Sequence, residues 1–164
     1  MLFRSLDERE AAVSLLACCG SKNWVQGMLT QRPFRSIDHL WHAADETWGS
    51  LEQMDWVEAF HTHPRIGEKG SEKQASVARQ WSEQEQAGTH GARAKVLSEL
   101  REANRAYEAR FGYTFIVCAT GKTAEEMLAL LQQRLQNEPD KELRIAAEEQ
   151  RRITQLRLEK LLQL

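Results

Sequence analysis

The chain has 164 residues, 41% of them hydrophobic and 28% charged, a mixture that supports a folded core and argues against disorder. Its 22 basic and 24 acidic residues leave a net charge of -2, so no basic excess points to nucleic acid. The apolar runs are too short to cross a bilayer, and the N-terminus lacks the apolar stretch of a signal peptide. We therefore expect one globular domain over residues 1–164, with no nucleic-acid or membrane partner.

The chain contains three cysteines, Cys18, Cys19 and Cys118. An odd number that includes an adjacent pair makes a poor disulfide framework, so the sequence favours a reducing compartment. Cys18 and Cys19 precede a glycine at an expected helix end, where structural thiols are more common than reactive ones. Because the last residues, EKLLQL, also do not form a peroxisomal tripeptide, we expect a cytoplasmic protein.

The first part of the chain reads as short helices separated by glycine or proline. Ser5 and Glu8 have the spacing of a capping box and open a first helix, which the next glycine ends. Ser21 can cap a second helix, which the sequence QRPF interrupts. Ser36 opens a third helix, and a fourth helical segment must stop near Pro64.

The second part continues with helices after a loop, PRIGEKGSEK, that contains two glycines. A polar helix follows through residues 75–78, and Ser82 with Glu85 has the spacing of another capping box. A long helix is expected over residues 91–110, because its apolar residues recur at helical spacing and Gly112 ends it.

The stretch YTFIVCATG is short, apolar and partly β-branched. No second strand-like run exists to pair with it, so we expect an extended segment and not a sheet. Thr123 with Glu126 starts another helix, and Pro139 suits the first turn of the last one. The sequence therefore predicts an all-α fold, a single irregular multi-helix domain of about eight helices with one short extended segment.

The stretch FHTHPRIGEKG carries His61 and His63 where the fourth helix must stop. In extended backbone both side chains point to one side and could bind zinc, but a catalytic zinc site takes three protein ligands, and the sequence has no HExxH or CxxC motif. One histidine can instead complete the helix end, where a cation suits the dipole. His63 also stands at a loop edge fixed by Pro64, a good place for proton transfer.

Other polar residues also have both a structural and a functional interpretation. Ser82 and Glu85 can cap a helix, but a carboxylate beside a histidine would raise the histidine pKa and hold its tautomer, so Glu85 and Gln86 have two candidate roles. Arg157 lies on an apolar helical stripe, where it either snorkels, pairs with an internal carboxylate or binds a substrate carboxylate. The extended segment is either core alone or a backbone surface for a flat, ureide-like ligand.

Several stretches, taken together and in this order, resemble one family. They are CCGSKNW, RPF, FHTHPRIG, SEQEQAG, YEARFGYTFIVCATGK and ITQLRLEKL. At these separations they are similar to 2-oxo-4-hydroxy-4-carboxy-5-ureidoimidazoline (OHCU) decarboxylase, from about Ala11 to Leu162. The resemblance implies an all-helical decarboxylase of urate breakdown that forms (S)-allantoin from a small ureide without a cofactor or a metal, and it implies that a homodimer is common.

The resemblance also assigns site residues. The catalytic positions of the family fall on His63, the expected proton donor, and on Glu85, expected to orient the substrate and tune His63. Because the adjacent carbonyl and imine can accept the electrons that carbon dioxide leaves behind, no cofactor is required as an electron sink. The substrate-binding positions fall on Pro64, Ser82, Gln86, Phe115, Ile116, Val117, Cys118, Ala119 and Arg157.

Two other functions are weighed against this one. A metal-dependent ureide hydrolase would use His61 and His63 as ligands and would lose activity with a chelator. A non-enzymatic helical domain would bind a ureide without turnover and would tolerate the loss of His63. Formation of optically active allantoin faster than the spontaneous reaction would separate the decarboxylase from both.

Overall fold

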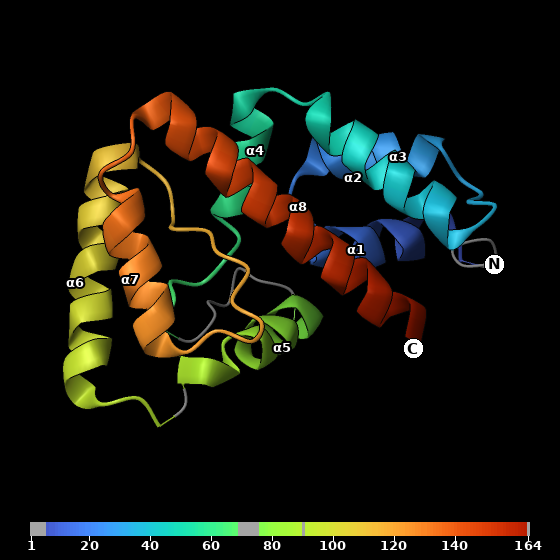
Figure 1. Ribbon diagram of the computed structural model, residues 1–164. Helices are drawn as coiled ribbons and strands as arrows, with labels where there is room; N and C mark the ends of the chain where they lie inside the picture. The colour runs from blue at the N-terminus through green and yellow to red at the C-terminus, as the bar shows by residue number, and fades with distance from the viewer. Residues whose placement is uncertain (1–5, 69–75, 90, 164) are drawn as a thin grey trace. The chain divides into compact units, whose positions relative to one another are not determined.

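The structure is a computed structural model that describes residues 6–68, 76–89 and 91–163 (Figure 1). Over these ranges it consists of eight α-helices and one short 3₁₀ helix, with no β-strand, which confirms the predicted all-α fold. None of the described helices is both long and apolar enough to cross a membrane. The chain divides into two compact units, unit 1 (residues 1–59 and 151–164) and unit 2 (residues 60–150).

Unit 1 is built mainly from four helices near the N-terminus. Helix α1 packs against α2, and α2 packs against α3. Buried aromatic and aliphatic side chains form its core, and the indole Nε1 of Trp24 donates a hydrogen bond to the carbonyl of Ala44 at 3.2 Å. The helices are α1 (Glu8–Cys18), α2 (Lys22–Thr30), α3 (Ile37–Gly49) and α4 (Gln53–Phe60), with the second half of α8 (Pro139–Gln163).

The first helix begins two residues later than predicted. Ser5 lies outside the described residues, and the N-cap is Asp7, whose side chain accepts a hydrogen bond from the amide of Glu10. The Glu10 side chain in turn accepts from the Asp7 amide at 3.0 Å, which completes a capping box. The prediction that Glu8 belongs to the box is therefore wrong. With Asp7 as the N-cap, the third helical position is Glu10 and not Glu8.

The next two predicted caps are confirmed. Ser21 accepts a hydrogen bond from the amide of Trp24, and Ser36 accepts one from the amide of His39. Both serines have extended backbone dihedrals, as N-cap residues do.

The two adjacent cysteines at the end of α1 are buried. Burial raises the pKa of both thiols, Cys18 and Cys19, from 9.0 to about 12, because a thiolate there would lose its solvation. The nearby Arg157 charge opposes this shift only in part. Their protonated state fits the structural role expected from the sequence.

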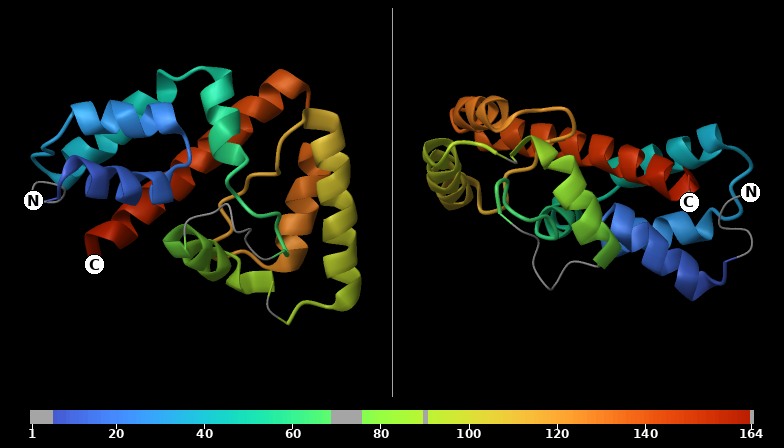
Figure 2. Two further views of the ribbon diagram at one scale, coloured as in Figure 1. Left: turned by 180° about the vertical axis from the view of Figure 1, so that it is seen from behind. Right: turned by 90° about the horizontal axis from the view of Figure 1, so that it is seen from below.

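Unit 2 contains the remaining helices and the extended segment. Helices α6 and α7 pack side by side, as both figures show (Figure 1, Figure 2). The polar helix expected through 75–78 is described from Ser76 onward, and residue 75 lies outside the described ranges. The elements of unit 2 are α5 (Ser76–Glu85), η1 (Ala87–Thr89), α6 (Ala94–Phe111), α7 (Ala124–Arg134) and the first half of α8.

The connection between α6 and α7 carries the extended segment. Gly112 ends α6 with φ 83°, in the left-handed region that glycine adopts without strain. Residues 113–119 then run through the unit without strand pairing and are largely buried. Thr123 caps α7 by accepting from the amide of Glu126, and α8 starts at Pro139, so these predictions are confirmed.

The second predicted capping box is wrong. Ser82 lies in the last half of α5, and its hydroxyl donates to the carbonyl of Ala78, one turn earlier, at 2.9 Å. Glu85 is the last residue of that helix. Neither residue therefore begins a helix, and the free amides of a helix N-terminus are not present at this position.

Candidate active site

His63 stands in the turn that follows α4. Its amide donates to the carbonyl of Phe60 at 3.2 Å, which closes the turn, and its ring is half-buried, whereas His61 is exposed. The ring Nε2 lies 2.6 Å from Oε1 of Gln150, a fully buried residue in the first half of α8. Because an amide oxygen can only accept, this contact assigns the Nε2 hydrogen of His63 to Gln150.

The loop after His63 is fixed by two neighbouring elements. The carbonyl of Ile66 accepts from Nδ2 of Asn104, a fully buried residue of α6, at 3.1 Å. The amide of Gly67 donates to Oε1 of Gln86 at 2.9 Å. These bonds connect the loop after Pro64 to α6 and to the residue that follows α5.

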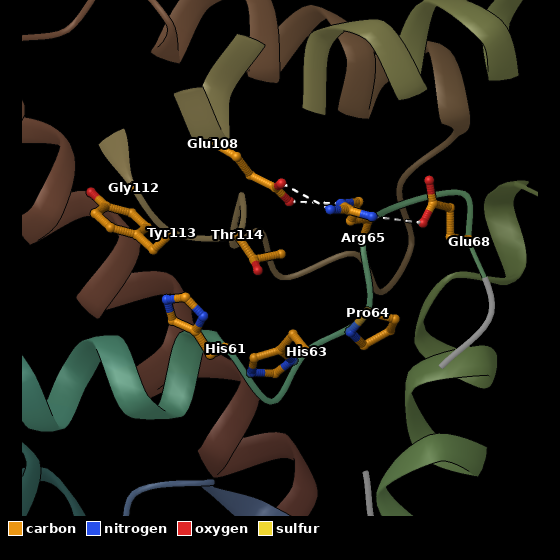
Figure 3. A pocket seen from close by; sticks show the side chains of 9 residues that line it. All are labelled: His61, His63, Pro64, Arg65, Glu68, Glu108, Gly112, Tyr113 and Thr114. Carbon is orange, nitrogen blue, oxygen red and sulfur yellow. Dashed lines mark hydrogen bonds and ion pairs between the residues drawn. The ribbon is translucent and has the colours of Figure 1, made fainter. Parts of the chain in front are cut away.

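A cavity of about 390 Å³ opens beside this loop (Figure 3). In Figure 3 Arg65 lies between Glu108 and Glu68, and its Nε donates to Oε1 of Glu108 at 2.8 Å. His63 and Pro64 are the predicted site residues in its lining, whereas the other predicted positions are not part of it. The cavity is lined by His61, His63, Pro64, Arg65, Glu68, Glu108, Gly112, Tyr113 and Thr114.

The three predicted residues from the end of α5 are buried. Ser82 is 3% exposed, and Glu85 and Gln86 are each 8% exposed. The negative charge of Glu85 is one of the causes that raise the pKa of Cys118, after burial itself, so the carboxylate lies near the extended segment. A Cβ on Gly88 would collide with the carbonyl of Lys122, which shows how closely the chain after α5 approaches that segment.

The extended segment presents its backbone in an ordered way. Phe115 to Ala119 are all 9% exposed or less. The carbonyl of Ile116 accepts from Nη1 of Arg134, and the carbonyl of Cys118 accepts from Nζ of Lys122 at 2.7 Å. No described residue accepts a hydrogen bond from the amide of Val117 or Ala119. Buried amides without a partner are rare in proteins, so this backbone is suited to bind a ligand.

Arg157 belongs to unit 1. Its side chain is 2% exposed, and Nη1 donates to the carbonyl of Ala17 at 3.2 Å. Sequence reasoning offered a carboxylate partner or snorkelling, and the backbone carbonyl at the end of α1 is a partner of a third kind.

Sequence reasoning missed Gln150, Asn104 and Arg134. Gln150 is spaced three residues before Ile153 and seven before Arg157, so the helical stripe that singled out Arg157 also contained it. Asn104 stands on the apolar stripe of α6, and a polar residue in such a stripe is a signal for a buried hydrogen bond. Arg134 stands three residues after the buried Leu131 on one face of α7, so it too is a polar residue in an apolar stripe.

Among the described residues, no group of three or more histidine, cysteine, aspartate or glutamate side chains is placed to hold a metal ion. The histidine pair His61 and His63 therefore has no third ligand in that part of the chain.

Comparison with known proteins agrees with this arrangement. The family model described as OHCU decarboxylase matches residues 4–159. The chain belongs to the OHCU decarboxylase family. This confirms the resemblance seen in the sequence motifs, which covers almost the same range.

Two relatives and one solved structure match most of this chain. It is 33% identical over 132 residues to the 2-oxo-4-hydroxy-4-carboxy-5-ureidoimidazoline decarboxylase of Amia calva, covering 80% of this chain and 75% of that protein. It is 39% identical over 145 residues to the uric acid degradation bifunctional protein of Arabidopsis thaliana, and the match spans only 45% of that longer protein. A crystal structure of OHCU decarboxylase in the presence of (S)-allantoin superposes with a TM-score of 0.79 at 35% identity, over 95% of this chain and 98% of that one.

Proposed function

We propose that the protein is a carboxy-lyase that converts OHCU to (S)-allantoin and carbon dioxide in urate degradation. The observation that carries this proposal is the family match over nearly the whole chain, 156 residues from 4 to 159. The site adds a half-buried imidazole at a cavity and, in the same unit, a buried backbone segment in which the amides of Val117 and Ala119 have no acceptor among the described residues.

The reaction takes up one proton net and needs an acceptor for one electron pair. The bond between ring carbon C4 and the carboxylate breaks, carbon dioxide leaves, and the electron pair moves through C5 into the ring imine. The imine nitrogen that receives the pair takes up one proton, a second proton reaches one face of C5, and the C4 hydroxyl loses its proton as it becomes a carbonyl. One proton is consumed overall, and the face that receives it fixes the S configuration. The protein must therefore orient the carboxylate and supply a proton from one side.

His63 is the proposed proton donor. Because Gln150 accepts the Nε2 hydrogen, the transferable proton is assigned to Nδ1. Glu85 is the second catalytic residue of the proposal, orienting the substrate through its ureido N–H groups and tuning His63. Both residues belong to unit 2.

The remaining positions are proposed to bind the substrate. The amides of the segment from Phe115 to Ala119, which includes Ile116, Val117 and Cys118, would donate to the ring and ureido carbonyl oxygens. Ser82, Gln86 and Pro64 would shape the pocket wall around the ring. Arg157 is proposed, from its position in the sequence, to bind a carbonyl or enolate oxygen with its guanidinium group.

Location and assembly are also part of the proposal. The three cysteines are free and buried, which suits a reducing cytoplasm. A homodimer is proposed from the family resemblance. Light scattering of the purified chain would give about twice its 18.9 kDa mass for a dimer and that mass itself for a monomer.

A matched pair of variants tests the role of His63. Fresh OHCU is mixed with the parent protein, His63→Gln or His61→Gln, and the circular dichroism of the product is followed. The parent should form the (S)-allantoin signal faster than the spontaneous racemic reaction. His63→Gln should lose roughly 100- to 10,000-fold in rate, the contribution of a positioned acid. His61→Gln should stay near the parent rate, because that ring is exposed.

The same experiment separates the other two functions. Equal loss in both histidine variants, with inactivation by a chelator, would support the metal-dependent hydrolase. Binding of allantoin without turnover by the parent would support the non-enzymatic domain. A His63→Gln variant that forms optically pure (S)-allantoin at the parent rate would remove His63 from the mechanism.

A further inference from the structure

We propose that Arg134 and Lys122 are positioning residues that bind one edge of the extended segment and thereby aim the amides of Val117 and Ala119 at the substrate. This inference rests on the proposed function and adds two residues to it. Neither residue is among the catalytic or substrate-binding positions that the family resemblance assigns, and neither is expected to touch the substrate.

Arg134 is fixed by its surroundings before it reaches the segment. The side chain is 6% exposed, and Nε donates to Oε1 of Glu142 at 2.7 Å. Glu142 is fully buried and also accepts from the hydroxyl of Tyr107 at 2.6 Å. The guanidinium carbon lies 4.5 Å from the ring centroid of Phe115. With its plane held by these contacts, the guanidinium donates from Nη1 to the carbonyl of Ile116 from a defined direction.

Lys122 binds the next carbonyl along the same edge. Its Nζ donates to the carbonyl of Cys118 at 2.7 Å, and its own amide donates to the carbonyl of Ala119 at 3.0 Å. The second bond closes a turn, so the lysine is anchored at its backbone as well as at its charged end. The side chain is half-buried, which shields the contact from water.

Because of peptide geometry, binding these two carbonyls also fixes the direction of two amides. The carbonyl of Ile116 and the amide of Val117 belong to one planar trans unit and point in opposite directions, as do the carbonyl of Cys118 and the amide of Ala119. Carbonyls two residues apart in extended backbone point to the same edge. Cations that bind the 116 and 118 carbonyls therefore turn the 117 and 119 amides to the other edge, roughly 6.6 Å apart.

Charge strengthens the same effect. A cation on a carbonyl polarises its peptide unit, so the amide at the other end becomes a better donor. Two such donors on one edge suit a flat molecule with spaced carbonyl oxygens, the chemistry of a cyclic ureide. They would also favour an oxygen that gains negative charge as carbon dioxide leaves.

The plainer interpretation is that Arg134 and Glu142 only connect α7 to the first turn of α8. Tyr107→Phe separates the two, because it removes one hydrogen bond to Glu142 from the same buried network and leaves the bond between Arg134 and the segment intact. Lys122→Met keeps the side-chain length and removes only the donor. Because Lys122 lies in a turn and not in a helix, Lys122→Met still tests the proposal if Arg134→Lys does not fold.

The experiment compares the parent with Arg134→Lys, Lys122→Met and Tyr107→Phe in two ways. Amide ¹⁵N relaxation of the ligand-free proteins gives the order parameters of Val117 and Ala119, expected near 0.85 in the parent and falling toward about 0.6 in the first two variants. Titration with (S)-allantoin and steady-state kinetics with OHCU should show roughly tenfold weaker binding and a raised KM in those two variants. Tyr107→Phe should change neither, while its thermal midpoint falls.

Each outcome has a defined meaning. Unchanged order parameters in Arg134→Lys and Lys122→Met would overturn the proposal, and so would an equal loss of allantoin affinity in Tyr107→Phe. A parent that neither binds allantoin nor decarboxylates OHCU would refute the proposed function, and the relaxation data on Val117 and Ala119 would still decide whether the two cations position the segment.

Discussion

His63 and Gln150 form a pair that chain position alone does not suggest, since 87 residues separate them. The amide oxygen of Gln150 sets which ring nitrogen of His63 keeps its hydrogen. A proton donor must have the correct tautomer and ring orientation, so under the proposed mechanism Gln150 would act on the reaction through His63 without touching the substrate.

Replacing Gln150 should therefore affect turnover more than binding. Gln150→Leu is expected to lower kcat roughly tenfold with KM little changed, because His63 loses a hydrogen bond that orients it. Gln150→Glu keeps the acceptor and adds a charge that favours the imidazolium, so activity should persist to higher pH than in the parent.

The control for this pair is Gln132→Leu, which replaces an exposed glutamine of α7 in the same unit. Steady-state kinetics between pH 6 and 9 measure all three variants. Equal pH profiles for the parent and Gln150→Glu would contradict the assignment of Gln150 as the partner that sets the state of His63.

At the scale of a single helix, capping shows where local spacing suffices. Ser21, Ser36 and Thr123 were predicted as caps and all three accept the expected amide. Ser82 has the same spacing to Glu85, but it lies inside α5 and bonds back to the preceding turn. The spacing of a capping box recurs by chance within helices, and the helical residues before it decide the outcome.

Ser36→Ala should lower the free energy of unfolding by about 1 kcal/mol, because the amide of His39 would lose its acceptor at the start of α3. Ser36→Asp should recover most of that loss. Ser98→Ala, an exposed position inside α6, makes the same chemical change and should stay within about 0.5 kcal/mol of the parent. Urea unfolding measures the three variants, and equal losses at Ser36 and Ser98 would contradict the capping role.

At the scale of the whole molecule, the single domain expected over residues 1–164 stays a prediction. The chain divides into two compact units, and α8 contributes residues to both. A helix that continues through both units gives a physical reason for them to unfold together, because helix formation is cooperative along the chain.

Tryptophan fluorescence can test that cooperativity. The chain has five tryptophans, and only Trp81 lies in unit 2. In Trp81→Phe, fluorescence therefore reports unit 1 alone, while far-ultraviolet circular dichroism reports helices of both units. A single domain predicts coincident urea midpoints for the two signals. Separate midpoints would show that the units unfold independently.

The sequence by itself determined the family, the all-α class, most helix boundaries and the residue type of the proposed proton donor, because motifs, caps, prolines and helical spacing act over a few residues. It also predicted that the stretch YTFIVCATG is extended and does not form a sheet, since no second strand-like run exists to pair with it. Tertiary structure decided which polar groups meet: Gln150 with His63, Asn104 with the following loop, and Arg134 with the Ile116 carbonyl. Such partners come from distant parts of the chain. Burial strengthens their hydrogen bonds, and these groups become buried only after the helices have packed.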